Sequence, residues 1–514
     1  MTAEVELKLA LPERSLRELE DAPLLRQAAA QARTERLSSV YFDTRKLKLY
    51  RCGLSLRVRS DGKRHVQTVK SMHQASSGLA SRGEWEAEIP GPAPDLAMAG
   101  DTALEPLLSK RLARALKPIF ETRVERKLYP LRVGGASVEL ALDRGCIETD
   151  HRSEQICELE IELKQGHPAE LFRVARELAE AAPLRLSVRS KAERGYGLVA
   201  GEKARAVSAG DIELCQGSSS AEAFAKIASS GLFQVVANWE AVCRGDAQGV
   251  HEMRVGLRRL RTALSLFSAM LRDGQSQTIK QGLKWLADEL GPARQLHVFK
   301  SRVIEPFRSL HARIYSFDSL DEELARRRDE GEARARAAIE SARFRALLLE
   351  ASEWIEEGDW LKTPDELISA MRRRPIEGVA ADILSRRTAK ILKRGKKLRE
   401  LDARKRHKLR IATKKLRYGT EFFATLFGRA KPSEGRKDFL KALKRLQSFL
   451  GDLNDVTAHQ QYCISLARER PSGGCEVAYL AGIISGLEEA KVEPRLRSSE
   501  RAHRQLMRME PFWK

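Results

Sequence analysis

Two short segments, far apart in the sequence, carry acidic side chains at every second position. The first is Glu4-Val5-Glu6-Leu7-Lys8 and the second is Glu158-Leu159-Glu160-Ile161-Glu162. Because side chains of a β-strand alternate between its two faces, each segment collects its carboxylates on one face. Carboxylates stacked in this way repel one another, so a positive group must lie among them if that face is buried. For either segment alone, a solvated edge strand is the alternative interpretation.

A divalent metal ion is the obvious candidate for the positive group. Mg²⁺ and Mn²⁺ prefer hard oxygen ligands, and Mg²⁺ usually combines one or two carboxylates with phosphate oxygens of a substrate. Arg57 and Arg59 share one strand face between the acidic segments, and Lys70 follows on the next strand. Basic side chains facing carboxylates bind phosphate oxygens well, which is the arrangement that phosphoryl transfer needs.

The 514 residues are enough for two or three domains, and their charge is uneven. Residues 1–200 carry 33 Lys and Arg against 29 Asp and Glu, whereas the remaining 314 residues carry 59 against 42. The net charge of +21 therefore lies mainly in the second part of the chain. Such a surplus indicates a polyanionic partner: nucleic acid, an acidic membrane surface or polyphosphate.

The cysteines and the hydropathy pattern indicate a soluble protein of a reducing compartment, which we take to be the cytoplasm. The seven cysteines are scattered and form no CxxC pair, which argues against a disulfide framework or a zinc site. No stretch approaches eighteen apolar residues, and the N-terminus lacks the pattern of a signal peptide. We therefore expect no insertion into a membrane.

The fold class predicted from the periodicities is α+β with more than one domain. Residues 1–200 contain many runs of alternating polarity separated by Gly, Asp or Ser, with a few short helical segments between them. Strands with charges of both signs on one face favour a closed antiparallel barrel with a charged lumen, because closure removes the edges and gives inward charges partners.

The order of these motifs resembles the CYTH domain of the triphosphate tunnel metalloenzymes. The motifs are Glu4-x-Glu6-x-Lys8, Tyr41-x-Asp43, Leu56-Arg57-x-Arg59, Thr68-x-Lys70, Arg126, Asp143, Glu158-x-Glu160-x-Glu162 and Ser190-Lys191. The resemblance spans residues 1–200 and implies an eight-stranded antiparallel tunnel that binds a triphosphate.

The resemblance also implies roles for individual residues. The metal ligands for Mg²⁺ or Mn²⁺ would be Glu4, Glu6, Glu158 and Glu160, and the phosphate-binding residues would be Lys8, Arg57, Arg59, Lys70, Arg126 and Lys191. Arg123 is an alternative to Arg126, since their spacing puts them on opposite faces of an ideal strand. Asp143 would either position water or hold an arginine, and the role of Glu162 is open. Water would attack the terminal phosphorus in line, without a nucleophilic side chain.

After a predicted linker at 201–219, helical patterns continue over 220–510 and contain an internal repeat. The segment His251 to Arg261 recurs 156 residues later as His407 to Arg417. Each copy is followed by a second predicted helix end, at Leu290-Gly291 and at Leu450-Gly451. We expect two related helical units, at about 220–300 and 380–465.

Each repeated helix has an apolar back and a basic front. The basic positions with their histidines are His251, Arg254, Arg258 and Arg261 in the first copy and His407, Arg410, Lys414, Lys415 and Arg417 in the second. A solvated basic face is the alternative interpretation. A solvated helix usually mixes Glu with Lys at i,i+4, however, and these faces are nearly all positive.

This helical part resembles the CHAD domain, whose motif positions are held by those same residues. The resemblance implies binding of inorganic polyphosphate along a basic groove between two halves related by a pseudo-twofold axis. The first copy departs from the pattern, because it has Arg294-Gln295 where the second has Asn454-Asp455. No paired His or His/Asp spacing supports metal binding by the histidines.

Together, the two parts resemble the bacterial CYTH-CHAD inorganic triphosphatases. The favoured function is metal-dependent hydrolysis of inorganic triphosphate to diphosphate and phosphate, with the helical part bound to polyphosphate, including that of cytoplasmic polyphosphate granules. The alternatives are a polyphosphate-binding protein with little catalysis, and an enzyme acting on an organic triphosphate such as thiamine triphosphate. Nucleic acid is disfavoured as a partner, because aromatic residues are only 6% of the chain and the basic faces carry few on which a base could stack.

Overall fold

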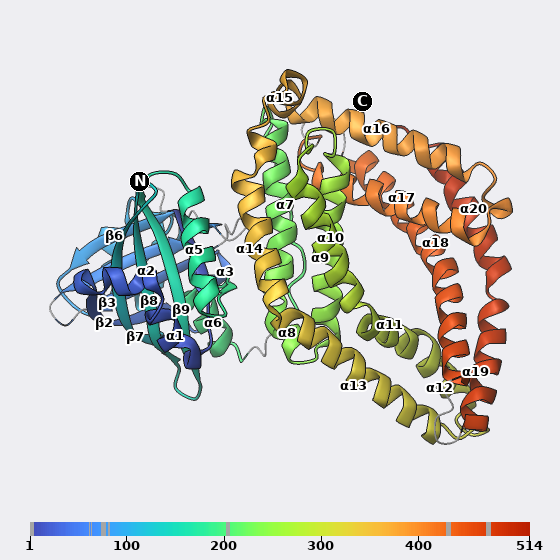
Figure 1. The fold of residues 1–514 in the computed structure, drawn as a ribbon, viewed down its shortest axis with the longest axis horizontal. Helices are drawn as coiled ribbons and strands as arrows, with labels where there is room; N and C mark the ends of the chain where they lie inside the picture. The colour runs from blue at the N-terminus through green and yellow to red at the C-terminus, as the bar shows by residue number, and fades with distance from the viewer. Residues whose placement is uncertain are drawn as a thin grey trace. The chain divides into compact units, whose positions relative to one another are not determined.

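The computed structural model describes residues 5–60, 62, 64–72, 79–80, 83–201, 206–427, 433–468 and 474–513. The chain divides into two compact units. The N-terminal unit comprises Met1–Val207 with Leu232–Ala241 and Glu340–Gly358, and the helical unit comprises Ser208–Gly231, Val242–Ile339 and Asp359–Lys514. The predicted fold class is confirmed, since an antiparallel sheet comes first and a mostly helical region follows (Figure 1).

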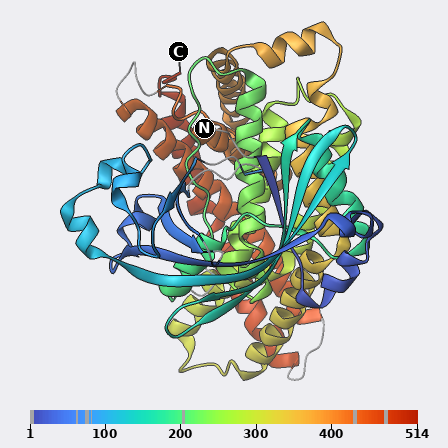
Figure 2. The ribbon, with the colours of Figure 1, turned by 90° about the vertical axis from the view of Figure 1, so that its left-hand side faces the viewer.

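One antiparallel sheet of ten strands forms the N-terminal unit. The strands are β1 (Val5–Ala10), β2 (Arg33–Thr44), β3 (Leu54–Ser60), β4 (His65–Ser71), β5 (Leu79–Ala80), β6 (Glu84–Ile89), β7 (Leu116–Val133), β8 (Ala136–Glu148), β9 (Ser153–Gln165) and β10 (Arg185–Leu186). Their order is β10-β1-β9-β8-β7-β2-β3-β4-β6, and β5 pairs with β1. The sheet is strongly curved, as Figure 2 shows.

The predicted eight-stranded, closed tunnel differs from this sheet in two details. Two additional strands, β5 and β10, are only two residues long, which is too short to produce a recognisable alternation in the sequence. Among the described residues, the pairings end at β6 and β10 instead of joining these strands into a ring. The curvature, rather than complete closure, therefore provides the concave face.

The register of the central strands places the charged side chains on one face. Glu160 lies opposite Lys8 of β1, and Glu158 lies opposite Asp143 of β8. On the next strand, Arg126 lies opposite Asp143. Since directly opposed residues share a sheet face, the alternating pattern of the sequence brings these groups together.

The other face of the central strands is apolar and covered by a helix. Leu7 and Leu9 of β1 and Ile161 of β9 are almost completely buried. They belong to strands that contact α5 (Ala169–Ala181), whose Phe172 is also fully buried. Burial of these side chains fixes the register, because a slip by one residue would exchange the charged and apolar faces.

The remaining helices of the first 200 residues are short: α1 (Leu16–Glu20), α2 (Pro23–Ala28), α3 (Lys48–Arg51), α4 (Lys110–Ala115) and α6 (Lys191–Val199). From residue 220 the elements are α7 (Ser220–Ala237), α8 (Trp239–Cys243), α9 (Ala247–Leu266), α10 (Gly274–Glu289), α11 (Gly291–Phe299), α12 (Glu305–His311), α13 (Asp318–Glu340), α14 (Ala342–Glu357), α15 (Glu366–Arg373), α16 (Ile376–Gly395), α17 (Ala403–Phe422), α18 (Ser433–Arg468), α19 (Gly474–Glu489) and α20 (Val492–Met507). In the described part of the chain, no helix is long and apolar enough to span a bilayer.

The internal repeat is visible as two matching helices, α9 and α17. Each has 20 residues and begins after an aspartate whose side chain caps the first turn, Asp246 for α9 and Asp402 for α17. Each ends at a phenylalanine, and the rings of Phe267 and Phe423 contact each other with centroids 6.0 Å apart. The two copies therefore pack together.

The second predicted helix end of the repeat is correct in the first copy and wrong in the second. The helix breaks after Glu289, and α11 begins at Gly291-Pro292. The second copy continues through Gly451 as the 36-residue helix α18. Asp452 occupies the position of Pro292 and retains a backbone N–H, so the helix is not interrupted there.

We expect Asp43 to be a key stabilising residue of the N-terminal unit. Its fully buried carboxylate accepts hydrogen bonds from the backbone N–H groups of Thr44, Leu49 and Tyr50, at 2.6, 2.9 and 3.0 Å. Asp43→Ala leaves these donors without their acceptor and should destabilise the unit by about 3 kcal/mol. Hydrogen exchange of the Leu49 and Tyr50 amides measures this loss.

Asp21→Ala is the matched control, because the Asp21 side chain is 66% exposed and, in the part of the chain that the structure describes, its one ion pair is with the exposed Arg26. It should change stability by no more than about 0.5 kcal/mol. Equal protection of the two amides in Asp43→Ala and the wild type would contradict the prediction.

Candidate functional site

A polar cavity of about 200 Å³ lies on the concave face of the sheet. Its lining comes from eight strands, β1 to β4 and β6 to β9, and from the start of α6. Nine residues that the sequence predicted for the site line this one cavity: Glu6, Lys8, Arg57, Arg59, Lys70, Arg126, Asp143, Glu160 and Lys191. The structure therefore brings together groups that are up to 185 residues apart in the sequence.

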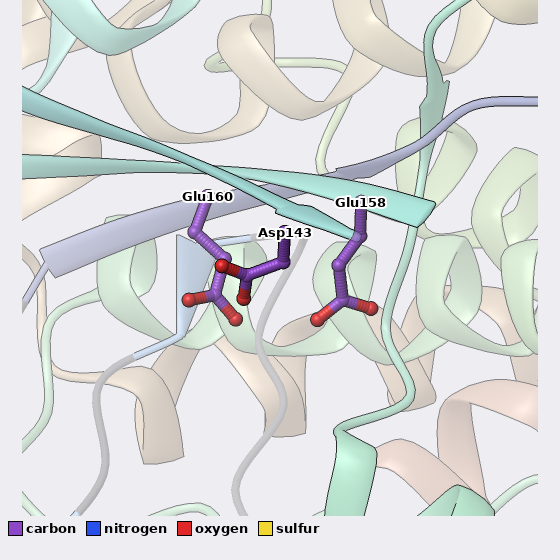
Figure 3. A group of neighbouring side chains, drawn as sticks. All are labelled: Asp143, Glu158 and Glu160. Carbon is purple, nitrogen blue, oxygen red and sulfur yellow. The ribbon is translucent and has the colours of Figure 1, made fainter. Parts of the chain in front are cut away.

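Three carboxylates form a compact cluster at this cavity: Asp143, Glu158 and Glu160 (Figure 3). Each offers an oxygen, and these oxygens lie within 4.8 Å of one another. Asp143 is fully buried and Glu158 is 2% exposed. Such close, buried negative charges require compensation.

Three cations from three different elements provide that compensation. Lys8 Nζ of β1 lies 2.7 Å from Glu160 and 3.6 Å from Glu158. Lys191 Nζ, at the start of α6, lies 2.7 Å from Asp143 and 3.0 Å from Glu160, and it also contacts Glu158. Arg126 donates two hydrogen bonds to Asp143, both of 2.7 Å, and one of 2.6 Å to Glu160.

The network favours the charged forms of Lys8, Lys191, Arg126 and Glu160. Burial would lower the pKa of Lys8, but the charges of Glu160 and Glu158 outweigh it and raise that pKa. Burial would also lower the pKa values of Lys191 and Arg126, but the neighbouring carboxylates outweigh burial and raise both. The pKa of Glu160 lies well below its usual value, because Lys191 and Lys8 outweigh the effect of burial.

Strands β3, β4 and β6 carry a second group of charges in the cavity. Lys70 Nζ lies 2.5 Å from Glu84, and Arg57 lies 3.5 Å from the same carboxylate. Burial and then the charge of Arg57 lower the pKa of Lys70. The pKa of Glu84 falls because Lys70 and Arg57 outweigh its burial. The periodic acids at 84 and 86 were visible in the sequence, but their pairing with Arg57 and Lys70 depends on strand neighbours.

Arg59 differs from the other cations of the cavity. Within the described residues it makes no ion pair, and its buried Nε has no hydrogen-bond partner. The neighbouring charge of Arg57, followed by burial and the charge of Arg126, lowers the pKa of Arg59 to about 10. A guanidinium beside other cations and without a carboxylate partner is suited to an anionic ligand.

Helix α6 positions two of the functional groups. Ser190 and Glu193 form a capping box that fixes the first turn, where Lys191 projects towards the carboxylates. Arg194 of the same helix lies 2.7 Å from Glu154 and 3.2 Å from Glu158. No role for Arg194 was predicted from the sequence. The one indication of a role was its position three residues after Lys191, on the same helix.

The carboxylate cluster fits a divalent cation. Carboxylate oxygens are the hard ligands that Mg²⁺ and Mn²⁺ prefer, and three of them converge within a few ångströms. Each carboxylate has two oxygens with about four lone-pair directions, so contact with a cationic side chain leaves positions for an ion. The residues that would hold it are Asp143, Glu158 and Glu160, and Glu6 lines the same cavity.

Among the predicted residues that the structure describes, Arg123 does not lie in the cavity, and Glu158 lines a second pocket. Arg123 has a side chain that is 62% exposed and pairs with Glu121 and Glu148 at 3.0 Å, whereas Arg126 lines the cavity. Glu4 lies outside the described residues. Glu162, whose role was open, lines the cavity opposite Glu6, and Lys164 lies 2.6 Å from it.

In the helical unit, basic residues of the two repeat copies interact with each other. His251 has its pKa lowered to about 4 by burial and then by the charges of Arg294, Arg258 and Arg254, with Lys414 of the second copy also contributing. Burial and then the charges of Arg410 and Arg258 lower the pKa of Lys414 to about 7. These residues therefore form one basic cluster rather than two separate sites.

Within the described residues, a carboxylate forms an ion pair with the basic motif of the second copy, whereas none does so in the first copy. Asp455 lies 3.5 Å from Arg410 and 3.3 Å from Arg302, and Nδ1 of His407 lies 2.5 Å from Oδ1 of Asn454. The corresponding position of the first copy adds a positive charge, Arg294, whose pKa is lowered by burial and then by Arg258. The sequence difference at 294–295 thus concentrates positive charge on the first copy.

The other predicted basic residues have different surroundings. Arg417 pairs with Glu421 at 2.6 Å and hydrogen-bonds to Gln447, so a carboxylate already balances it. Lys415 does not join the cluster of Lys414. Its pKa is lowered by burial and then by the charges of Arg387 and Arg261.

Comparison with known protein families matches both parts of the chain. Residues 2–196 match the CYTH domain, and residues 226–463 match the CHAD domain. An inorganic triphosphatase of Haemophilus influenzae is 30% identical over 201 residues, which are 38% of this chain. The match spans only 55% of that relative's length.

Solved structures give likenesses to each part. The CHAD domain from the plant Ricinus communis is 25% identical, with a TM-score of 0.49 over 60% of this chain and 98% of that chain. HpAC1 from Hippeastrum, described as having a dominant triphosphatase activity, is 21% identical, with a TM-score of 0.31 over 39% of this chain and 97% of that chain. From the two domain matches, the chain belongs to the proteins in which a CYTH domain is followed by a CHAD domain.

Proposed function

We propose that this protein hydrolyses inorganic triphosphate to diphosphate and phosphate in the cavity of its CYTH domain, with Mg²⁺ or Mn²⁺, and that its CHAD domain binds inorganic polyphosphate. The observation that carries the first part is the composition of the cavity. Asp143, Glu160 and Arg59 line this space, and Glu158 adjoins the two carboxylates. Arg59 has no ion pair within the described residues, and its buried Nε has no hydrogen-bond partner. A carboxylate cluster for a metal beside a guanidinium for phosphate matches the requirements of phosphoryl transfer.

The cationic side chains would bind and orient the phosphate chain. Arg57, Arg59 and Lys70 would hold the part that leaves as diphosphate, because they come from adjacent strands of one wall. Lys8, Lys191 and Arg126 would turn from the carboxylates towards phosphate oxygens and stabilise the charge that develops in the transition state. A divalent cation on the carboxylates supplies further neutralisation of that charge. Water is the nucleophile, so no side chain forms a covalent intermediate.

The size and polarity of the cavity favour a small inorganic substrate. Its volume of about 200 Å³ is below the range of roughly 300 to 1,000 Å³ that is typical of pockets for larger organic ligands. Its lining is dominated by charged and hydroxyl side chains, which suit phosphate groups better than a nucleobase or a thiazole ring. Thiamine triphosphate and ATP are the organic alternatives.

The basic cluster of the CHAD domain supports the second part of the proposal. Arg254, Arg258 and Arg294 have no ion pair with a carboxylate in the described part of the chain, and the pKa of Arg254 is lowered to about 10 by burial and then by Arg258. A polyanion would remove this mutual repulsion. The proposal includes attachment to polyphosphate granules in the cytoplasm through this domain.

The carboxylate cluster should be essential for turnover. We expect Glu160→Gln to lower metal-dependent phosphate release from triphosphate by more than about 100-fold, because it removes a charge to which Lys8, Lys191 and Arg126 are oriented. Phosphate release by the full chain is measured with Mg²⁺, with Mn²⁺ and after chelation. Glu125→Gln is the control, since this side chain is 55% exposed and its one ion pair within the described residues is with the exposed Arg36, at 4.0 Å. Equal rates for Glu160→Gln and the control would contradict the metal assignment.

The unpaired arginine should determine substrate binding. Arg59→Ala is expected to raise KM for triphosphate and to lower kcat/KM by about 100-fold, whereas Arg36→Ala, at a side chain that is 90% exposed, should change neither. The same assay with ATP, thiamine triphosphate and long-chain polyphosphate should give the highest kcat/KM for triphosphate. Negligible turnover of all four compounds would instead favour the polyphosphate-binding protein with little catalysis.

Binding of polyphosphate should weaken as the pH rises through 7. Burial, Arg410 and Arg258 lower the pKa of Lys414 to about 7, so the free protein loses this charge above that pH. A bound polyanion favours the charged form, and binding above pH 7 must therefore take up a proton, at a cost of up to about tenfold in affinity per pH unit. Titration calorimetry between pH 6 and 9 measures the trend. Lys414→Arg, which stays charged, should flatten it, and identical pH profiles for the two proteins would refute the assignment to Lys414.

A further inference from the structure

A second group of cations surrounds a single serine in the helical unit. Lys415 Nζ of α17 lies 2.8 Å from the hydroxyl oxygen of Ser265, which belongs to α9. Arg387 of α16 donates to the backbone carbonyl of Ser265 at 2.9 Å and to its hydroxyl at 3.3 Å. Neighbouring helices therefore bring two long cationic side chains to one point, and Figure 1 shows α16 and α17 side by side.

This group has no acidic partner that would explain it. Arg261 and Lys390 complete the group, since their charges act on Lys415. None of the four cations forms an ion pair with a carboxylate within the residues that the structure describes. Repulsion among them adds to burial in lowering the pKa of Lys415, and burial followed by Arg386 lowers that of Arg387. Positive charge is thus held together here at a cost in stability, which a bound anion would offset.

The group around Ser265 is centred on a different lysine from the basic cluster of the two histidine motifs. The charges of Arg410 and Arg258 act on Lys414, whereas those of Arg387, Arg261 and Lys390 act on Lys415. The reason is geometric, because adjacent residues of a helix project about 100° apart. Arg261 also acts on Arg254 of the first cluster, so it links the two groups. Arg258 and Arg261 lie almost one turn apart on α9, so this helix connects the two groups.

We propose that Arg261, Arg387, Lys390 and Lys415, with the hydroxyl of Ser265, form a second phosphate-binding subsite that a long polyphosphate chain reaches after it has filled the first cluster. The proposal rests on the proposed binding of polyphosphate by the CHAD domain. It adds α16, which contributes two of the four cations and lies outside the repeated motif. Phosphate is the matching ligand because its oxygens accept hydrogen bonds from guanidinium, ammonium and hydroxyl groups together.

Two subsites on one surface make affinity depend on chain length. A short chain occupies one subsite, whereas a chain that spans both gains the second contact intramolecularly and at high effective concentration. Loss of the second subsite should therefore weaken long chains much more than short ones. This differential effect separates a subsite from a general loss of positive charge, which weakens both.

The test measures binding of polyphosphate of about 10 and about 40 phosphates to the full chain by calorimetry at several salt concentrations. Ser265→Asp, which places a carboxylate among the cations, and Arg387→Ala should each lower long-chain affinity by about tenfold and change short-chain affinity less than about twofold. Thermal unfolding checks that both variants fold, and two independent substitutions keep the test valid if one does not. Lys437→Ala, at an exposed lysine of α18, is the matched control for loss of one charge and should leave the ratio of the two affinities unchanged.

The possible outcomes separate this inference from the proposal on which it rests. In one outcome, Ser265→Asp and Arg387→Ala leave the dependence of affinity on chain length unchanged, while Arg258→Ala weakens the binding of both long and short chains. This result would overturn the second subsite and leave polyphosphate binding in place. Absence of polyphosphate binding to the wild type would overturn both. Displacement of long polyphosphate by single-stranded RNA at equal phosphate concentration would show that the surface recognises nucleic acid backbones, which also overturns the inference.

Discussion

The ion network around the buried carboxylate of Glu160 is the interaction on which the rest of the CYTH domain depends. Lys8 reaches this carboxylate from strand β1, Lys191 from helix α6 and Arg126 from the central strand β7. Removing any one of them leaves a buried charge without full compensation, which typically costs several kcal/mol. The network therefore joins distant parts of the chain, and its ion pairs offset the cost of burying so many charges in one cavity.

The same network explains how a stable cavity can accept a phosphate chain. In the free protein the carboxylates satisfy the cations, with Arg59 as the exception among those that line the cavity in the described residues. In the proposed complex, phosphate oxygens would take positions around the cations, and a divalent cation would be held by the carboxylates. The metal ion would offset part of the negative charge that the phosphate chain brings.

The CHAD domain uses the opposite principle. Its basic groups are held together with few carboxylates, and burial followed by their mutual repulsion lowers the pKa values of His251, Arg254 and Lys414. Asp455 forms an ion pair with Arg410 of the second repeat copy and also acts on Arg294 of the first. A surface of this kind is suited to a polyanion that neutralises many cations at once, rather than to catalysis on a single phosphate.

Much of the CYTH site could be predicted from the sequence, because strand periodicity alone determines which side chains share a face. The alternation of Glu158 and Glu160 with leucine and isoleucine indicated a charged strand face. It predicted a charged lumen only together with the basic residues of neighbouring strands and the resemblance to the CYTH domain. The role of Arg194 could not be predicted in this way, since its contact with Glu158 requires the packing of α6 against the sheet. Likewise, no local pattern could show that Arg59 is unpaired, because this depends on where every neighbouring carboxylate points.

The helical part was predictable to a different degree. The repeat identified α9 and α17 and their basic faces, since helical periodicity extends over 20 residues in each. The continuous helix α18 was missed, because Leu450-Gly451 resembles a helix end although the following aspartate permits the helix to continue. The separation of Lys414 from Lys415 depends on α16, a helix outside the repeated basic motif, and only the tertiary structure reveals it.

The most direct test of the proposed metal and triphosphate site is a crystal structure of the full chain with Mn²⁺ and triphosphate. The diffraction data are collected at a wavelength where manganese scatters anomalously. We expect a manganese peak bounded by carboxylate oxygens of Asp143, Glu158 and Glu160. We also expect phosphate oxygens to accept hydrogen bonds from Arg59 and from Lys8 or Lys191. Manganese and triphosphate bound outside this cavity, with the carboxylates still paired only to their cations, would contradict the proposed site.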